Sequence, residues 1–292
     1  MVCKPCTTIL RFVGMTSSEP SVTHVIPKGN QVGGVTSLGD DVFVVRFERQ
    51  QIEVYDAVTF TLQRSLAVPE LGSRSLGLAV CPSNNCLYAS DWENNDVHRI
   101  ELSGSNAVTK WSVARSPAGL SVNRAQSLIV VSNGERKLQE FTTHGTLLQN
   151  IQLQLGTESP NPWHAIHLAS DQFAVCCRES LNGLCLVDSR GAVIRSYGGH
   201  KGSQVMNMKS PASLAVDKYE SILVADMLNN KLLVLDRSLA SAHEMSVSVD
   251  GGLKGPRSLW YDKSRGRLYI GEWDGGRLIV IDYLNNFDTA RV

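Results

Sequence analysis

The sequence has no long hydrophobic run and no excess of charge of either sign. It contains no stretch of about 18 or more apolar residues, the length that a membrane-spanning helix needs. The 28 Lys and Arg side chains balance the 28 Asp and Glu side chains, so no overall field attracts the chain to nucleic acid or to an anionic membrane. Because 42% of the residues are hydrophobic and only 19% are charged, we expect a folded globular protein, and collagen, coiled coil and bulk disorder are excluded.

The chain also lacks the cysteine pattern of a disulfide framework or a zinc site. Its 7 cysteines are odd in number and irregularly spaced, and Cys3-x-x-Cys6 has no second pair of the same kind. Cys81 and Cys86 frame an expected tight turn and are interpreted as buried fillers. Arg11 interrupts the only apolar run near the N-terminus, so a signal peptide is not expected. We therefore predict an intracellular, cytoplasmic protein with free thiols.

A repeated phrase is the strongest signal in the sequence. Residues 211–217, 221–226 and 231–236 form three short apolar runs, and the same runs return at 256–262, 267–272 and 277–282, so the second copy starts 45 residues after the first. Four looser copies precede them. The first apolar positions of the six copies were aligned as Val35, Leu78, Leu120, Ile166, Leu214 and Leu259.

Each copy predicts one blade of a β-propeller. Three β-branched-rich runs and a weaker fourth run, separated by Gly, Asn, Asp and Ser turns, predict four antiparallel strands. Six copies therefore predict an all-β, six-bladed β-propeller formed by a single domain at 22–292, after an N-terminal extension at 1–21. The expected blades cover about 32–71, 72–115, 116–155, 156–199, 200–252 and 253–292.

The last blade lacks an outer strand of its own. Only ten residues follow Asp282, the end of the sixth copy, and half of them are polar, so they are too few and too polar for a well-packed outer strand. The apolar run at 22–26 precedes the first full copy and is free to pair with the last one. We expect this N-terminal strand to close the ring, which leaves no sheet edge open.

The repeats resemble the NHL repeat, most closely in the second, fifth and sixth copies. The segment 224–236 reads Val-Ala-Asp, then a short loop with Asn229 and Asn230, then a basic residue and an apolar strand. Asp91 is followed by a similar loop. The resemblance covers about 32–282 and implies a six-bladed propeller like that of tripartite-motif proteins, but Arg46 and Arg178 stand where the family has Asp. Because NHL propellers occur in ubiquitin ligases, in RNA repressors and in a metal-dependent lyase, the family leaves the activity open.

Alternating strand directions place the loops between second and third strands, and those between blades, on one face. Three of the 5 Trp residues fall in these loops, together with several Arg. Trp and Arg dominate binding hot spots, so we predict that this face binds a partner. The alternative is that Trp92 and Trp273 pack between blades as wedges and that Trp163, next to Pro162 and an apolar strand, is structural too. The predicted binding-face residues are Arg49, Arg74, Trp92, Glu93, Arg136, Trp163, His164, Arg178, Arg257 and Trp273.

Acidic and basic side chains alternate on this face, which favours a protein or peptide over a phosphate backbone. The sequence therefore predicts a monomeric, non-catalytic recognition or scaffold propeller without a cofactor, with a ubiquitin-pathway adaptor implied by the resemblance. RNA is the first alternative. It would bind at the densest basic stretch, which comprises Lys254, Arg257, Lys263, Arg265, Arg267 and Arg277.

A metal-dependent propeller lactonase or lyase is the second alternative. Such an enzyme needs several metal ligands around the axis. The residues expected to end the second strands are Arg46, Asp91, Asn133, Arg178, Asp226 and Glu272. Two arginines in that ring would repel a divalent ion, and the two aspartates are expected to accept hydrogen bonds from loop amides. His164 and His167 would lie on opposite sides of one strand, so no catalytic or metal residue is assigned.

Overall fold

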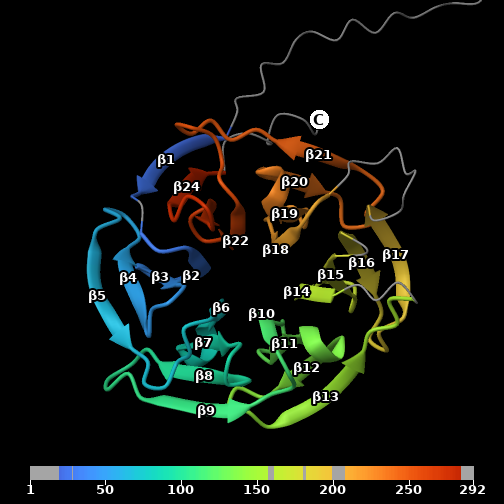
Figure 1. Cartoon of the computed structure of the whole chain (residues 1–292), viewed down its shortest axis with the longest axis horizontal. Coiled ribbons are helices and arrows are strands. Elements are labelled where there is room, and N and C mark those ends of the chain that lie inside the picture. Colours follow the sequence, from blue (N-terminus) through green and yellow to red (C-terminus); the bar gives the residue numbers. More distant parts are fainter. Residues whose placement is uncertain (1–19, 28, 157–160, 180–181, 199–207, 284–292) are drawn as a thin grey trace, which may run out of the picture.

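The computed structural model describes residues 20–27, 29–156, 161–179, 182–198 and 208–283. In this part of the chain, 24 strands form six four-stranded antiparallel sheets around one axis (Figure 1). Helical structure among the same residues is limited to three 3₁₀ turns, η1 (Pro82–Asn84), η2 (Asn133–Glu135) and η3 (Met227–Asn229). The predicted all-β, six-bladed propeller is confirmed. Among the described residues, no helix is long and apolar enough to span a membrane.

The strands keep the order of the repeat from the axis outward. The first strands are β2 (Val32–Leu38), β6 (Ser75–Cys81), β10 (Pro117–Val122), β14 (Asn161–His167), β18 (Pro211–Val216) and β22 (Pro256–Asp262). The second strands are β3 (Asp41–Arg46), β7 (Cys86–Asp91), β11 (Leu128–Ser132), β15 (Phe173–Arg178), β19 (Ile222–Asp226) and β23 (Arg267–Glu272). The third strands are β4 (Gln51–Asp56), β8 (Asp96–Glu101), β12 (Lys137–Phe141), β16 (Gly183–Val187), β20 (Lys231–Leu235) and β24 (Leu278–Asp282). The outer strands are β5 (Leu62–Ala67), β9 (Val108–Ser112), β13 (Leu147–Gln152), β17 (Val193–Gly198), β21 (Ala242–Met245) and β1 (Ser21–Ile26).

The ring closes through the N-terminal strand. β1 pairs antiparallel with β24 and completes the sixth blade, with Ser21 opposite Asp282 and Ile26 opposite Leu278. Figure 1 shows β1 at the rim, outside β24. Ile26 is buried among residues of the first and last blades. The predicted closure is therefore confirmed, and it covers the sheet edge that β24 would otherwise expose.

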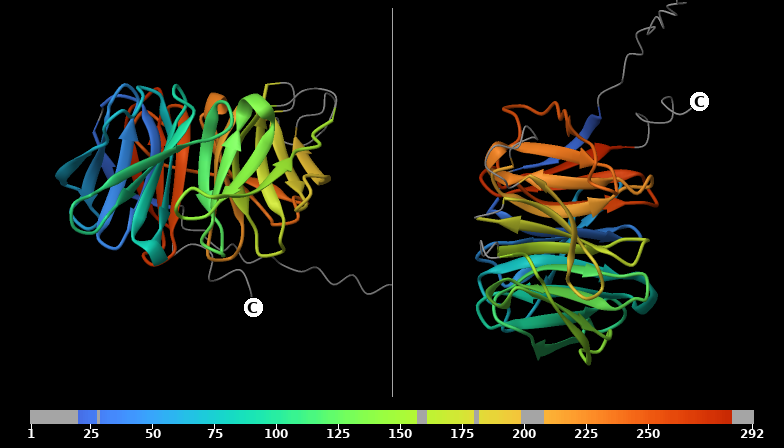
Figure 2. Two further views of the ribbon diagram at one scale, coloured as in Figure 1. Left: turned by 90° about the horizontal axis from the view of Figure 1, so that it is seen from below. Right: turned by 90° about the vertical axis from the view of Figure 1, so that its right-hand side faces the viewer.

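The hydrophobic core lies between the blades. Each of six buried apolar clusters joins two neighbouring blades, including the last and the first. Inner strands such as Leu128–Ser132 are buried along their whole length because a blade covers each face, whereas outer strands such as Leu147–Gln152 are mostly exposed. The side views in Figure 2 show the resulting flat ring of stacked sheets.

The pairing corrects the alignment of the repeats in the third and fourth blades. Ala165 pairs with Val175 as Leu214 pairs with Val224, so Ala165, and not Ile166, is the equivalent of Leu214. The small, fully buried Ala165 gave a weaker sequence signal than the larger Ile166 beside it.

The same shift applies where the second strands end. Asn133 and Arg178 are expected at the position of Asp91 but lie one residue beyond it, because Pro117 pairs with Ser132 and Pro162 with Cys177, as Pro211 pairs with Asp226. The positions equivalent to Asp91 are therefore Arg46, Ser132, Cys177, Asp226 and Glu272, although β15 itself ends one residue later, at Arg178 as predicted. Asn133 and Arg178 are instead equivalents of Trp92 and Trp273.

Candidate functional site: an arginine and tryptophan cluster at one mouth of the axial channel

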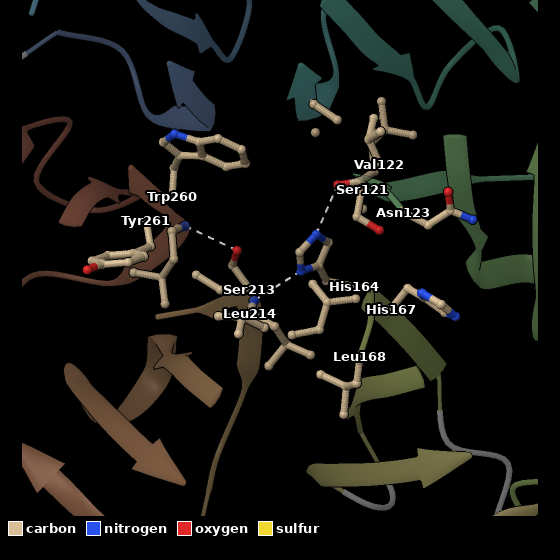
Figure 3. Close-up of a pocket in the computed structure, with 18 of the residues that line it drawn as sticks. Ser121, Val122, Asn123, His164, His167, Leu168, Ser213, Leu214, Trp260 and Tyr261 are labelled. Atoms are coloured by element: carbon tan, nitrogen blue, oxygen red, sulfur yellow. Dashed lines mark hydrogen bonds between the residues drawn. The ribbon is translucent and has the colours of Figure 1, made fainter. Parts of the chain in front are cut away.

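The six first strands enclose an axial channel of about 1370 Å³. Aliphatic side chains from every blade line its wall, and they include Val35, Leu78, Leu120, Leu214 and Leu259. Several of the lining residues are drawn in Figure 3. The wall therefore offers an apolar surface to a group that enters along the axis.

His164 is part of the channel wall and links three blades (Figure 3). Its Nδ1 accepts a hydrogen bond from the Leu214 amide at 3.0 Å, and its Nε2 donates one to the Leu120 carbonyl at 3.0 Å. Burial lowers the pKa of His164 to about 4, so the ring is neutral at physiological pH. Because both nitrogens are occupied, the ring holds the blades together and has no free lone pair to abstract a proton or bind a metal.

Serines continue the same pattern around the axis. Ser213 accepts a hydrogen bond from the Leu259 amide at 3.1 Å, and Ser258 accepts one from the Val35 amide at 2.9 Å. In the other half of the ring, glycine precedes the matching apolar position, and a Cβ at Gly119 would overlap the His164 ring. The wall is therefore a set of direct blade-to-blade contacts.

Above His164, a β-bulge turns Trp163 to the mouth of the channel. The register of β14 shifts between Pro162 and His164, which leaves Trp163 as the extra residue. The guanidinium of Arg178 lies over the Trp163 ring at 3.8 Å from its centroid, and the Trp92 ring lies 5.6 Å away. Trp92 belongs to the second blade and Trp163 to the fourth, so their contact crosses the mouth.

Arg257 extends this contact network to the sixth blade. It is the bulge residue of β22, and its guanidinium lies 5.2 Å from the Trp163 centroid and 4.4 Å from that of Trp273. Trp273 makes an edge contact with Phe47 at 5.0 Å. We define the mouth cluster by the six side chains in this network: Phe47, Trp92, Trp163, Arg178, Arg257 and Trp273.

The two arginines of the mouth cluster have no carboxylate partner among the described residues. Arg257 is only 6% exposed, and its Nε has no hydrogen-bond partner there. Arg178 donates from Nε to the Pro211 carbonyl at 3.3 Å, while its Nη2 is unpartnered in the same part of the chain. Burial, and then the positive charge of Arg178, lower the pKa of Arg257 to about 9, and burial lowers that of Arg178 to about 10. Both remain cationic at neutral pH.

Four predicted residues lie on the same face but outside the mouth cluster. Glu93 accepts a hydrogen bond from the Ser73 amide and lies 3.8 Å from the Arg74 guanidinium. Arg49 is exposed and borders a smaller cavity of about 370 Å³ beside the first blade, and Arg136 ends the η2 turn. The mouth cluster therefore unites Trp92, Trp163, Arg178, Arg257 and Trp273. It also includes Phe47, which sequence reasoning did not select although it follows a second strand as Trp273 does.

The expected structural role of the aspartates is confirmed. Asp91 accepts hydrogen bonds from the Gly72 and Asn94 amides, and Asp226 accepts one from the Ser210 amide at 2.9 Å. Burial would raise the pKa of Asp91, but the bonds from His98, Asn94 and the amides outweigh it and hold this pKa well below its usual range. Hydrogen bonds to the loop backbone therefore occupy these carboxylates.

Arg46 also binds backbone groups of the loops, but as a cationic hydrogen-bond donor. It donates to the carbonyls of Asn30 and Gly276 and pairs with Glu53 at 2.7 Å. Within the described residues, no group of three or more His, Cys, Asp or Glu side chains is arranged to hold a metal ion.

The comparisons with known proteins show the fold alone. No family model matches the chain, and no curated protein matches it. A catalytically inactive virginiamycin B lyase from Staphylococcus aureus, solved with quinupristin, is similar at 12% identity and a TM-score of 0.64, over 92% of this chain and 86% of that one. A Bacteroides thetaiotaomicron protein of unknown function matches at 15% identity and a TM-score of 0.70, over 90% and 72%. The Cps50 (Swd1) propeller domain of Myceliophteria thermophila matches at 12% identity and a TM-score of 0.60, over 90% and 99%. The chain is thus a β-propeller whose fold is similar to that of a lyase and to that of the Cps50 (Swd1) propeller domain.

Proposed function

We propose that this protein is a recognition propeller that binds a peptide or protein partner at the mouth cluster. The single observation that carries the proposal is the contact network of three tryptophans and two unpaired arginines across the channel entrance. Planar side chains of this kind supply large contact areas with few rotamers to immobilise, and they dominate binding hot spots. The apolar channel beneath offers a pocket for an anchoring side chain.

The charge distribution supports a peptide over RNA. In the basic stretch 254–277, Arg265 pairs with Asp40 at 2.6 Å, Arg267 with Asp282 at 2.9 Å, and Arg277 with Glu272 at 2.6 Å. These pairs neutralise the surface on which a phosphate backbone would have to lie.

The channel chemistry supports binding over catalysis. His164 lies in the channel wall beneath Trp163, and backbone groups of two other blades occupy both of its nitrogens. A general base needs a free nitrogen within reach of its substrate. The similarity to a lyase rests on the shared propeller. We extend the proposal to an intracellular adaptor, for which the NHL resemblance of the sequence is the support.

The test is a selection of random peptides displayed on phage against the full chain, followed by affinity measurements on variants. We expect the selected peptides to bind Trp92→Ala and Trp273→Ala at least about tenfold more weakly, because each substitution removes an aromatic contact surface from the mouth. Arg74→Ala lies on the same face outside the mouth cluster and serves as the control, which should bind normally.

Thermal melts of each variant separate lost contacts from lost folding. RNA oligonucleotides form the competing arm, and their affinity should fall by orders of magnitude as salt rises if the protein is an RNA binder. Peptides that bind both tryptophan variants as well as the unmodified chain, or RNA that binds in preference to every peptide, would refute the proposal.

A further inference from the structure

We propose that Arg178 and Arg257 together bind one carboxylate of a peptide, presented next to an apolar side chain that enters the channel. This inference rests on the proposed function and specifies the chemistry of its ligand. Its first support is a contrast within the molecule. The buried Arg46 and Arg277 each have a carboxylate within hydrogen-bond distance, at 2.7 and 2.6 Å. At the mouth, the buried Arg257 and the half-buried Arg178 have no such partner among the described residues.

Burial of two like charges without a counter-ion is unfavourable. A guanidinium that leaves water needs an acceptor for its N–H groups, and a second cation nearby adds repulsion. The Trp163 and Trp273 rings offset part of this cost through cation–π contacts at 3.8, 5.2 and 4.4 Å. Rings cannot accept the in-plane N–H bonds, so Nε of Arg257 and Nη2 of Arg178 stay buried without a hydrogen-bond partner among the described residues, and a ligand reaches them only if the side chains at the mouth move apart. An anion at the mouth would satisfy both.

An acidic residue beside Arg178 is already engaged. Burial lowers the pKa of Arg178 by more than the charge of Glu179, which favours the cationic form, raises it, and the Glu179 carboxylate accepts a hydrogen bond from the Asn161 side chain. Asp274, next to Trp273, is exposed. The two arginines therefore lack a carboxylate partner that a ligand could provide, although acidic residues lie at the rim.

The rim favours a single carboxylate over a polyanion. Glu93, Glu179 and Asp274 are exposed around the mouth cluster and would repel additional negative charges. The planar fork of a guanidinium matches the two oxygens of a carboxylate. Because Arg257 also lines the channel together with Leu76, Ala212 and Leu214, a group bonded to it lies beside an apolar wall. A carboxylate attached to an apolar residue fits both surfaces.

Two sources can present this chemistry, a peptide C-terminus and an internal acidic side chain. We would titrate the full chain with acetyl-Leu-Phe-Leu bearing a free carboxylate, with its amide, and with acetyl-Leu-Glu-Leu-amide and acetyl-Leu-Gln-Leu-amide. Fluorescence of the three mouth tryptophans, out of 5 in the chain, reports binding. We expect the free acid or the glutamate peptide to bind at least about tenfold more tightly than its neutral match, and the one that does so identifies the source.

Arg257→Met provides the decisive variant, with Arg190→Met, at an exposed arginine in the turn between β16 and β17, as its matched control. We expect Arg257→Met to lose the preference for the charged peptide while its melting temperature without ligand stays equal or rises, because an unpaired buried charge has been removed. A structural arginine would instead lower the melting temperature when replaced. Arg257→Lys keeps a charge but not the fork, and should recover part of the preference.

The outcomes separate this inference from the proposed function. If displayed peptides require Trp92 and Trp273 but neutral and charged peptides bind equally, the carboxylate site is refuted and the docking function stands. If inorganic phosphate displaces the charged peptide with similar affinity, the arginines bind any anion and the inference is also refuted. If no displayed peptide depends on the mouth cluster, the proposed function itself fails.

Discussion

Individual side chains in this propeller satisfy buried polar groups in two distinct ways. Most, such as Asp91 and Arg46, bond to loop backbone or to an opposite charge. Arg257 and Arg178 lie at the entrance of the channel, and each has one buried nitrogen without a hydrogen-bond partner among the described residues. Other buried atoms of the described residues also lack a partner, including Nε of Arg99, but Arg99 pairs with Glu101, whereas Arg178 and Arg257 have no carboxylate partner in that part of the chain. A ligand carboxylate would complete their bonding.

His164 gives a test at the same scale. Its folded-state pKa of about 4 lies below the ordinary 6.5, so the unfolded chain binds the proton first as the pH falls. The stability from the neutral ring is therefore fully present above pH 6.5 and is lost as the pH falls from 6.5 to 4, by up to about 3 kcal/mol. Urea unfolding at a series of pH values measures this loss.

The matched variant is His164→Gln, whose amide retains one donor and one acceptor for the Leu120 and Leu214 backbone groups. We expect it to have a shallower dependence of unfolding free energy on pH between 4 and 6.5. An equally steep dependence in the variant would assign the effect to other groups.

Residue types at the site could be predicted from the sequence, but their contacts could not. Trp92, Trp163 and Trp273 were placed on one face because the repeat fixes strand direction. Their contacts across the mouth depend on the bulges before His164 and Ser258, and no residue type marks these bulges unambiguously. His164 was expected on the binding face for the same reason, yet it lies in the channel wall beneath Trp163.

At the scale of strands, the sequence predicts most because each blade repeats the same hydrophobic pattern. The closing strand was predicted because the sequence has no suitable outer strand after Asp282, and the structure confirms the prediction. The predicted alignment of the repeats was wrong only where the hydrophobic pattern is weak, at Ala165 and at the positions just before Asn133 and Arg178.

The closing strand gives a test at this scale. Ile26 is 4% exposed and packs with Val32, Tyr269 and Leu278, which come from the first and last blades. We expect Ile26→Ala to lower the free energy of unfolding by about 2–4 kcal/mol, because it leaves a cavity where the ring closes. Thermal or chemical denaturation measures the change.

Ser21→Ala is the control, since Ser21 is in the same strand but exposed and should change stability by less than about 0.5 kcal/mol. Equal effects of the two substitutions would mean that β1 does not close the ring in solution.

At the scale of the whole molecule, the ring brings residues of separate blades together in the mouth cluster. The contacts of the mouth cluster join the second, fourth and sixth blades, which do not neighbour each other, so they exist only because the ring brings the three bulged or loop positions around one axis. Opening the ring at β1 would therefore disturb the mouth cluster as well as the sixth blade.

The most direct test of the account is hydrogen exchange of the full chain with and without a peptide obtained by display. We expect slower exchange at the starts of β14 and β22 and in the loop after β7, where Trp163, Arg257 and Trp92 lie. The turns at the opposite mouth, at 39–40, 123–126 and 263–266, should exchange as in the free protein. Protection confined to those opposite turns, or to the outer strands, would contradict the assignment of the mouth cluster as the docking surface.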